Sequence, residues 1–115
     1  MSAVFKRRIV REKVLQILYA FEMNNENLMA LTQSILGDVE DEHDRKYGED
    51  LVNRTLIHKI DLDSKIQQRV SNWEMGRIAL IDKILLRMAI CEILYFPDIP
   101  PKVSINEAIE IAKEF

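Results

Sequence analysis

The chain has 115 residues, 48% of them hydrophobic, and a formal net charge of −3. A chain of this length can bury one core but has little room for two, so we predict a single domain over residues 1–115. The acidic balance excludes attraction to nucleic acid through the average charge, and a phosphate-bearing partner would therefore need a local basic patch.

The first predicted helix runs from about Ser2, a suitable N-cap residue, to about Met23. Apolar residues recur along it at helical spacing and form its core face: Val10, Val14, Ile17, Leu18 and Phe21. Asn24 and Asn25 then end the helix.

The first turns of this helix carry four cations: Lys6, Arg7, Arg8 and Arg11. On a helical wheel one strip contains Arg8, Arg11, Leu15 and Tyr19. Cations followed by an aromatic ring suit an RNA strand, because Lys and Arg neutralise phosphates and a tyrosine ring can stack on an unpaired base. A solvated helix start is the alternative, although cations at a helix N-terminus oppose the helix dipole. The residues alone leave both interpretations open.

Two helices are predicted in the next part of the chain. A short one from about Leu28 to Leu36 ends at Gly37, a residue suited to a left-handed position after the helix. The acidic segment 38–44 follows as a loop or helix start. The other helix, from about 43 to 59, carries one strip formed by Tyr47, Leu51, Thr55 and His58.

A fourth helix is predicted to begin at Asp61 or Asp63, either of which could cap it, and to end before Gly76. Its apolar positions are Leu62, Ile66, Val70 and Trp73.

The fifth predicted helix, from about Ile78 to Tyr95, is apolar on most of its circumference, which is typical of a helix enclosed by neighbours. Charged residues interrupt it, so it is not a membrane span: Asp82, Lys83, Arg87 and Glu92. Cys91, the only cysteine, lies inside this run and excludes an internal disulfide and a CxxC zinc site. We therefore predict a protein without membrane segments in a reducing compartment, the cytoplasm.

Residues 96–101 hold all three prolines and form a predicted extended connector. Ser104 and Glu107 have the spacing of a capping box, which predicts that the last helix begins there. Its buried stripe is predicted to consist of Ile105, Ala108, Ile109 and Ala112. Helical spacing throughout, with only three glycines, predicts an all-α bundle.

The two histidines, His43 and His58, lie outside any recognisable catalytic or metal motif, so we predict no enzymatic activity, no metal and no cofactor. His58, Asp61 and Asp63 could form a metal cluster, but a helix end followed by a capping aspartate gives the same residues, and we favour this second interpretation. Asp82 has two open interpretations. It could be a carboxylate favoured by the dipole of its helix, or it could make a polar contact with a partner.

Three sequence blocks together resemble the NusB family of bacterial transcription antitermination factors. They are RRIVREKVLQILY at 7–19, IALIDKILLRMAICEIL at 78–94 and PKVSINEAIEIAK at 101–113. The similarity covers the whole chain, although residues 24–72 match the family in helical pattern more than in letters.

The resemblance implies an all-α fold of two small helical sub-bundles and no catalysis. It also implies binding of single-stranded boxA RNA in ribosomal RNA leaders, jointly with the ribosomal protein NusE, in the RNA polymerase antitermination complex. With the basic cluster, it gives these RNA-binding candidates: Lys6, Arg7, Arg8, Arg11 and Tyr19. Its partner-binding candidates are Asp82, Lys102 and Asn106.

Two departures from the family pattern modify these expectations. Ile9 stands where some members have another arginine, so we expect fewer phosphate contacts. Family members continue past the position of Phe115 into one more helix, so we expect this chain to lack the final C-terminal helix of the family. Apolar faces of the fifth and sixth helices would then be exposed.

Two other functions stay open at this point. The chain could be the NusB-like N-terminal RNA-binding domain of a ribosomal RNA cytosine methyltransferase, which the coding sequence after Phe115 would reveal. It could also be a helical dimerisation module without an RNA role, in which a stable homodimer would bury the first helix.

Overall fold

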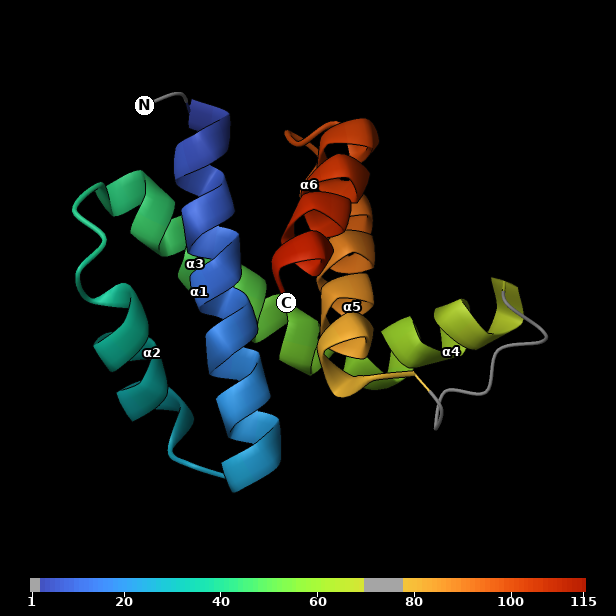
Figure 1. The fold of residues 1–115 in the computed structure, drawn as a ribbon, viewed down its shortest axis with the longest axis horizontal. Helices are drawn as coiled ribbons and strands as arrows, with labels where there is room; N and C mark the ends of the chain where they lie inside the picture. Colours follow the sequence, from blue (N-terminus) through green and yellow to red (C-terminus); the bar gives the residue numbers. More distant parts are fainter. Residues whose placement is uncertain (1–2, 70–77) are drawn as a thin grey trace. The chain divides into compact units, whose positions relative to one another are not determined.

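The computed structural model describes residues 3–69 and 78–115, with side chains from residue 6 onward. This described part confirms the all-α prediction and contains six helices (Figure 1). Their bounds are α1 Ala3–Asn24, α2 Leu28–Leu36, α3 Glu42–Ile57, α4 Lys59–Arg69, α5 Leu80–Tyr95 and α6 Pro101–Glu114. Within the described ranges, no helix has the length and apolar character needed to cross a membrane.

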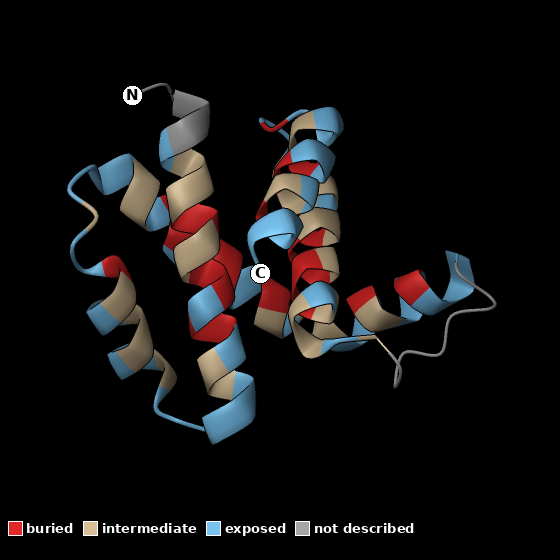
Figure 2. Cartoon of the chain, viewed as in Figure 1, coloured by how far each residue is buried: buried red, intermediate tan, exposed pale blue. Residues whose placement is uncertain are grey.

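The chain divides into two compact units, Met1–Asn53 and Arg54–Phe115, with the boundary inside α3. This division agrees with the expected pair of sub-bundles. In the first unit α1 and α2 lie side by side, and buried residues recur along α1 (Figures 1 and 2). The buried apolar side chains of this unit are Val10, Val14, Leu15, Ile17, Leu18, Leu36, Tyr47, Leu51 and Val52.

Three helices of the first unit approach closely at Gly48 of α3. A Cβ atom at this position would lie 2.8 Å from Cγ1 of Val10 in α1 and 3.1 Å from both Cδ atoms of Leu36 in α2. These distances are tighter than van der Waals contact, so a Cβ atom there would force the side chains of Val10 and Leu36 to shift. Gly48 therefore holds the start of α3, and the acidic segment before it, against α1.

The ends of the first two helices use local capping groups. α1 stops because Asn25 adopts a left-handed φ of 54°, which asparagine tolerates, and its N–H donates to the carbonyl of Phe21 at 3.0 Å. α2 begins at its N-cap Asn27, whose side chain accepts a hydrogen bond from the N–H of Ala30 at 3.0 Å.

The prediction of a left-handed Gly37 was wrong. Its φ of −62° is right-handed, because the chain leaves α2 through a further tight turn in which the N–H of Val39 donates to the carbonyl of Leu36 at 3.1 Å. Glycine is required there for space instead, since a Cβ would collide with the carbonyl oxygen of Gln33.

The prediction that Asp61 or Asp63 caps the fourth helix was also wrong. α4 begins at Lys59, directly after α3, and the N–H of Leu62 donates to the carbonyl of His58 at 2.8 Å. No loop separates the two helices, so both aspartates lie inside α4. The predicted roles of Ser2, Val70, Trp73 and Gly76 fall outside the described residues.

In the second unit α5 packs beside α6 and also contacts α4. Two charged side chains of α5 are buried with the core. Arg87 donates to Asp63 of α4 through Nε at 2.7 Å and Nη2 at 3.1 Å, and Glu92 accepts from Oγ of Ser104 in α6 at 2.8 Å. The buried apolar side chains of this unit are Leu62, Ile66, Ile84, Leu85, Met88, Cys91, Ile99 and Ile111.

The predicted capping box at Ser104 and Glu107 was wrong, because α6 begins three residues earlier, at Pro101. Proline suits the first position of a helix, where its fixed φ is helical and its missing N–H has no partner to lose. Ser104 and Glu107 consequently lie inside the helix and are buried, 2% and 4% exposed. The serine hydroxyl serves the buried Glu92 instead of the helix end.

The predicted buried stripe of α6 was therefore placed on the wrong face. Ile105 and Ile109 are 48% and 51% exposed, Ala112 is exposed and Ala108 is half-buried. The helix turns Ser104, Glu107 and Ile111 inward, because these positions share the face that bonds to Glu92.

Candidate nucleic-acid interface

The cations at the start of α1 do not share one face of the helix. Successive residues of an α-helix are rotated by about 100°, which separates Lys6 from Arg8 by about 160° around the axis. Lys6 therefore lies on the same side as Lys13, two turns later, whereas Arg8 lies on the side of Tyr19. Arg7 and Arg11 lie between these sides, one turn apart.

Arg7 and Arg11 both lie over the ring of Tyr47, a buried residue of α3. The guanidinium carbon of Arg7 is 4.2 Å from the ring centroid and that of Arg11 is 5.5 Å from it. Both distances suit a cation–π interaction. Arg7 keeps a side-chain exposure of 36% and an ion pair with Asp44, Nε to Oδ1 at 3.6 Å, whereas Arg11 is only 4% exposed. Tyr47 thus fixes two of the four cations, one at the surface and one beneath it.

The predicted strip from Arg8 to Tyr19 is interrupted by buried residues. Arg8 is half-buried and Tyr19 is 38% exposed, but Arg11 and Leu15 between them are 4% and 2% exposed. The exposed ends of this strip are eleven residues apart, about 16 Å along the helix. A strand that contacted both would have to pass over the buried positions Arg11 and Leu15.

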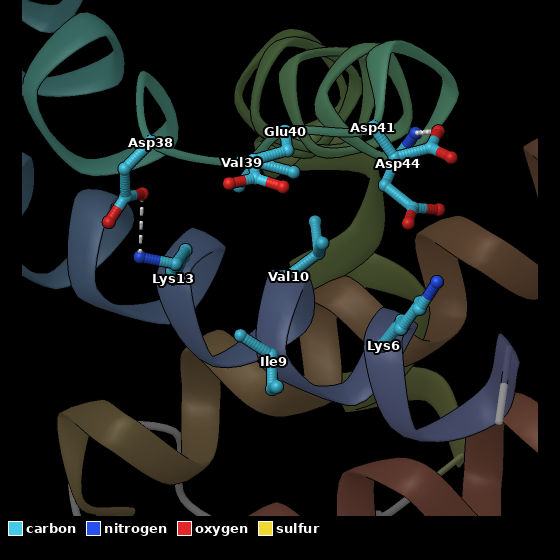
Figure 3. A pocket seen from close by; sticks show the side chains of 9 residues that line it. All are labelled: Lys6, Ile9, Val10, Lys13, Asp38, Val39, Glu40, Asp41 and Asp44. Atoms are coloured by element: carbon cyan, nitrogen blue, oxygen red, sulfur yellow. Dashed lines mark hydrogen bonds and ion pairs between the residues drawn. The ribbon is translucent and has the colours of Figure 1, made fainter. Parts of the chain in front are cut away.

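A groove of about 670 Å³ opens on the Lys6 side of α1, within the first unit. In Figure 3 Lys6, Ile9, Val10 and Lys13 line one wall, and the acidic segment 38–44 lies opposite. Nζ of Lys13 donates to Oδ1 of Asp38 at 3.0 Å and to the carbonyl of Ile35 at 3.3 Å. The groove therefore brings α1 cations against carboxylates.

Asp41 has a defined role in this acidic segment. Its Oδ1 accepts a hydrogen bond from the N–H of Asp44 at 3.1 Å, which caps the start of α3. This hydrogen bond is the main reason that the pKa of Asp41 is lowered, and the nearby His43 and Lys6 act in the same direction. Asp41 is therefore held as a carboxylate facing α1.

Sequence analysis did not predict the contacts of Lys13, Asp38 and Asp44 with the basic cluster. The signal available was charge alone: a basic helix start and an acidic segment some thirty residues later in a small domain. Charge patterns do not reveal which side of a helix a distant segment covers, and Gly48, whose missing side chain permits the approach, carries no electrostatic signal.

The three candidate partner-binding residues all belong to the second unit, and all are exposed. Asp82 lies in the first turn of α5, where the helix dipole favours a carboxylate, so both interpretations of this residue stay open. Lys102 and Asn106 lie one turn apart on α6, on the face that also exposes Ile105 and Ile109.

The possible metal cluster at the end of α3 is not assembled. The ring of His58 stacks on Tyr95 with centroids 4.0 Å apart, Asp63 binds Arg87, and Asp61 is exposed. Over residues 3–69 and 78–115 no three side chains among His, Cys, Asp and Glu gather in a way that could hold a metal ion. The chemistry of the described surface is thus that of charge and stacking.

Comparisons with known proteins identify relatives over nearly the whole chain. The profile of the NusB family matches residues 8–115. The protein named transcription antitermination protein NusB of Chloroherpeton thalassium is 41% identical over 97% of this chain, which spans 54% of that protein. The protein of the same name from Listeria monocytogenes is 44% identical over 94% of this chain and 81% of its own length.

Solved structures show the same arrangement of helices. T. maritima NusB superposes with a TM-score of 0.85 at 30% identity, covering 95% of this chain and 78% of that one. A chain in a structure titled "Crystal Structure of a Plectonemic RNA Supercoil" has a TM-score of 0.83 at 19% identity over 95% of this chain and 80% of its own, which shows a shared fold.

Proposed function

The chain belongs to the NusB family, a family of non-enzymatic factors, and we propose that it is an RNA-binding transcription antitermination factor that binds boxA RNA of ribosomal RNA leaders together with NusE. The names of its relatives support the antitermination role. RNA contact by α1, the boxA target, NusE as partner and a cytoplasmic location are the parts of the proposal that need experiments.

The observation that carries the proposal is the basic start of α1 in an otherwise acidic chain. Lys6, Arg7 and Arg8 all reach the surface, wholly or in part. Lys6 lies in the first turn of α1, where a cation opposes the helix dipole at a cost of a few tenths of a kcal/mol at an exposed site. A phosphate-bearing ligand explains why three cations gather at one end of α1 in a chain with a net charge of −3.

In the proposed complex, Lys6, Arg7 and Arg8 neutralise phosphates, and the exposed ring of Tyr19 stacks on a base or ribose. Arg11 contributes in a different way. Because it is buried over Tyr47, it adds positive potential from beneath the surface. A direct bond from Arg11 to a phosphate would require it to leave Tyr47.

The second unit supplies the proposed docking surface for NusE, with Asp82, Lys102 and Asn106 as its contact residues. Three phosphate contacts give only modest affinity and a modest dependence on salt, because each contact releases about one counterion. We therefore expect NusE to increase the affinity for RNA, and RNA to increase the affinity for NusE by the same factor.

The proposal is tested by fluorescence anisotropy with a labelled boxA oligonucleotide, with and without NusE. The test variant is Lys6→Ala with Arg8→Ala, which avoids the buried Arg11. Its matched control, Lys65→Ala with Arg69→Ala, also removes one lysine and one arginine, but from the exposed surface of α4. Circular dichroism verifies that both variants fold.

We expect the α1 variant to lose at least tenfold in affinity, and its salt slope to flatten by about 1.4, the value for two lost contacts to a single strand. The α4 variant should lose less than twofold. Equal losses of affinity in the two variants would show that only the change in net charge weakens binding. That result would contradict the assignment of the RNA-binding surface to α1.

A further inference from the structure

The acidic segment 38–44 faces two α1 cations that the proposed function assigns to RNA, Lys6 and Arg7, and also Lys13 two turns later. Asp44 pairs with Arg7 at 3.6 Å, and Asp38 pairs with Lys13 at 3.0 Å. Lys6 and Asp41 line the groove together with Lys13, Asp38 and Asp44 (Figure 3). The carboxylates of Asp38 and Asp44 thus lie beside cations that RNA phosphates would also contact.

The segment is held in this place at both ends. At its start, the N–H of Val39 donates to Leu36 and the carbonyl of Val39 accepts from Nη1 of Arg45 at 3.0 Å. At its end, Asp41 caps α3 through the N–H of Asp44. These bonds keep the carboxylates beside α1 without any need for strong ion pairs, which exposed residues do not form.

The ion pairs themselves are exposed enough to exchange partners. One side chain of each pair is exposed, Asp38 at 73% and Arg7 at 36%, and its partner is less so, Lys13 at 24% and Asp44 at 16%, so water and salt screen both pairs in part. Each such pair corresponds to a factor of about two to five in an equilibrium constant. A ligand phosphate can therefore displace a carboxylate at a small and measurable loss of affinity.

We propose that residues 38–44 form an autoinhibitory contact, in which Asp38 and Asp44 compete with RNA phosphates for Lys13 and Arg7. This inference rests on the proposed function and adds its regulation. It also extends the RNA-binding surface to Lys13 and the Lys6 side of α1. The contact reduces binding of RNA that offers few phosphates to this groove, and a ligand with several well-placed phosphates overcomes it.

The test measures the affinity of a boxA oligonucleotide for a variant in which Asp38→Asn is combined with Asp44→Asn. Asparagine keeps the size and an acceptor oxygen of aspartate but removes its charge. The control combines Glu26→Gln with Glu49→Gln, which changes the net charge equally. Both of these residues are exposed and lie outside the groove, Glu26 after the opposite end of α1 and Glu49 in α3 beside Asn27.

We expect the aspartate variant to bind about 4- to 25-fold more tightly than the wild type, with a salt slope steeper by up to about 0.7 because Lys13 adds one phosphate contact to the three proposed above. The glutamate control should gain less than twofold. Equal gains in the two variants, or no gain in either while the wild type binds RNA, would overturn the autoinhibitory contact alone. Absence of RNA binding by all three proteins would overturn the proposed function, and this inference with it.

Discussion

The bidentate pair between Arg87 and Asp63 is expected to hold α4 against α5. Replacing Asp63 by alanine removes both acceptors and leaves a guanidinium with a side-chain exposure of 7% without this partner. Hydrogen bonds to charged groups contribute about 1.5–3 kcal/mol, and removing one partner of a fully buried pair costs about 3–5 kcal/mol. Because Asp63 is itself 30% exposed, we expect a loss of about 2 kcal/mol in the free energy of unfolding.

The reverse replacement, Arg87→Met, should cost less. Methionine fills much of the volume of the arginine stem, and water can solvate the partly exposed Asp63, so we expect a loss of about 1 kcal/mol. In the double variant neither charge remains to be compensated. Its loss should therefore be smaller than the sum of the single losses, with a coupling energy of about 1 kcal/mol.

Urea unfolding followed by circular dichroism measures all four corners of this cycle. A loss of 2 kcal/mol also corresponds to a fall in Tm of roughly 8 °C for a domain of this size. Losses that add to within about 0.3–0.5 kcal/mol would show that the two side chains act independently. That result would refute the conclusion that this pair joins the two helices.

Three further predictions concern packing and burial. Gly48→Ala should destabilise the protein by about 1 kcal/mol in thermal unfolding. The cost of overpacking, about 1–3 kcal/mol, exceeds the gain in helix propensity of about 1 kcal/mol. A stabilised variant would contradict the close approach at this glycine. Ser104→Ala should lower the free energy of unfolding by about 1.5–3 kcal/mol, because it removes a hydrogen-bond donor from the buried Glu92. In the same urea unfolding experiment, the control Ser64→Ala, at an exposed position, should lower it by less than about 0.5 kcal/mol. Burial raises the pKa of the Cys91 thiol above its ordinary 9.0. The contribution of the protonated thiol to the free energy of unfolding is therefore fully present below pH 9.0 and is lost as the pH rises through the raised pKa. At pH 8 a thiol reagent should therefore modify Cys91 slowly in the folded protein and rapidly in urea, and equal rates would refute its burial.

The sequence was sufficient where local chemistry decides the structure. The bounds of α2 were predicted correctly, and the structure shows that local groups set both of them, the N-cap Asn27 and the glycine at 37, although this glycine is not left-handed. The end of α1 at Asn24 followed from two consecutive asparagines. In each case the deciding group lies within a few residues of the helix end that it fixes.

The errors arose where a distant partner decides. Ser104 and Glu107 have capping-box spacing, but the partner of the serine is Glu92, twelve residues earlier on another helix. The exposed Ile105 and Ile109 follow from the same cause, because the inward face of α6 carries Ser104 and Glu107 beside Ile111. Apolar periodicity assumes an apolar interface, and this interface is built around a buried carboxylate.

For the candidate interface, the residue types were visible in the sequence but the surface was not. The cations of α1 could be counted, whereas the burial of Arg11 depends on Tyr47, which lies thirty-six residues later and looks like an ordinary core position. The pairing of Lys13 with Asp38 likewise depends on how α2 and α3 turn back along α1. Packing thus separates the cations of α1 into three sets: Lys6 and Lys13 beside the groove, Arg7 and Arg11 over the ring of Tyr47, and Arg8 on the side of Tyr19.

The most direct test of the central claim, that RNA binds at the start of α1, is a titration of the ¹⁵N-labelled protein with boxA RNA, followed by amide chemical shifts. We expect the largest changes in residues 6–19 and in segment 38–44, with little change in α4. Changes concentrated in the second unit, with α1 unaffected at saturating RNA, would contradict the claim.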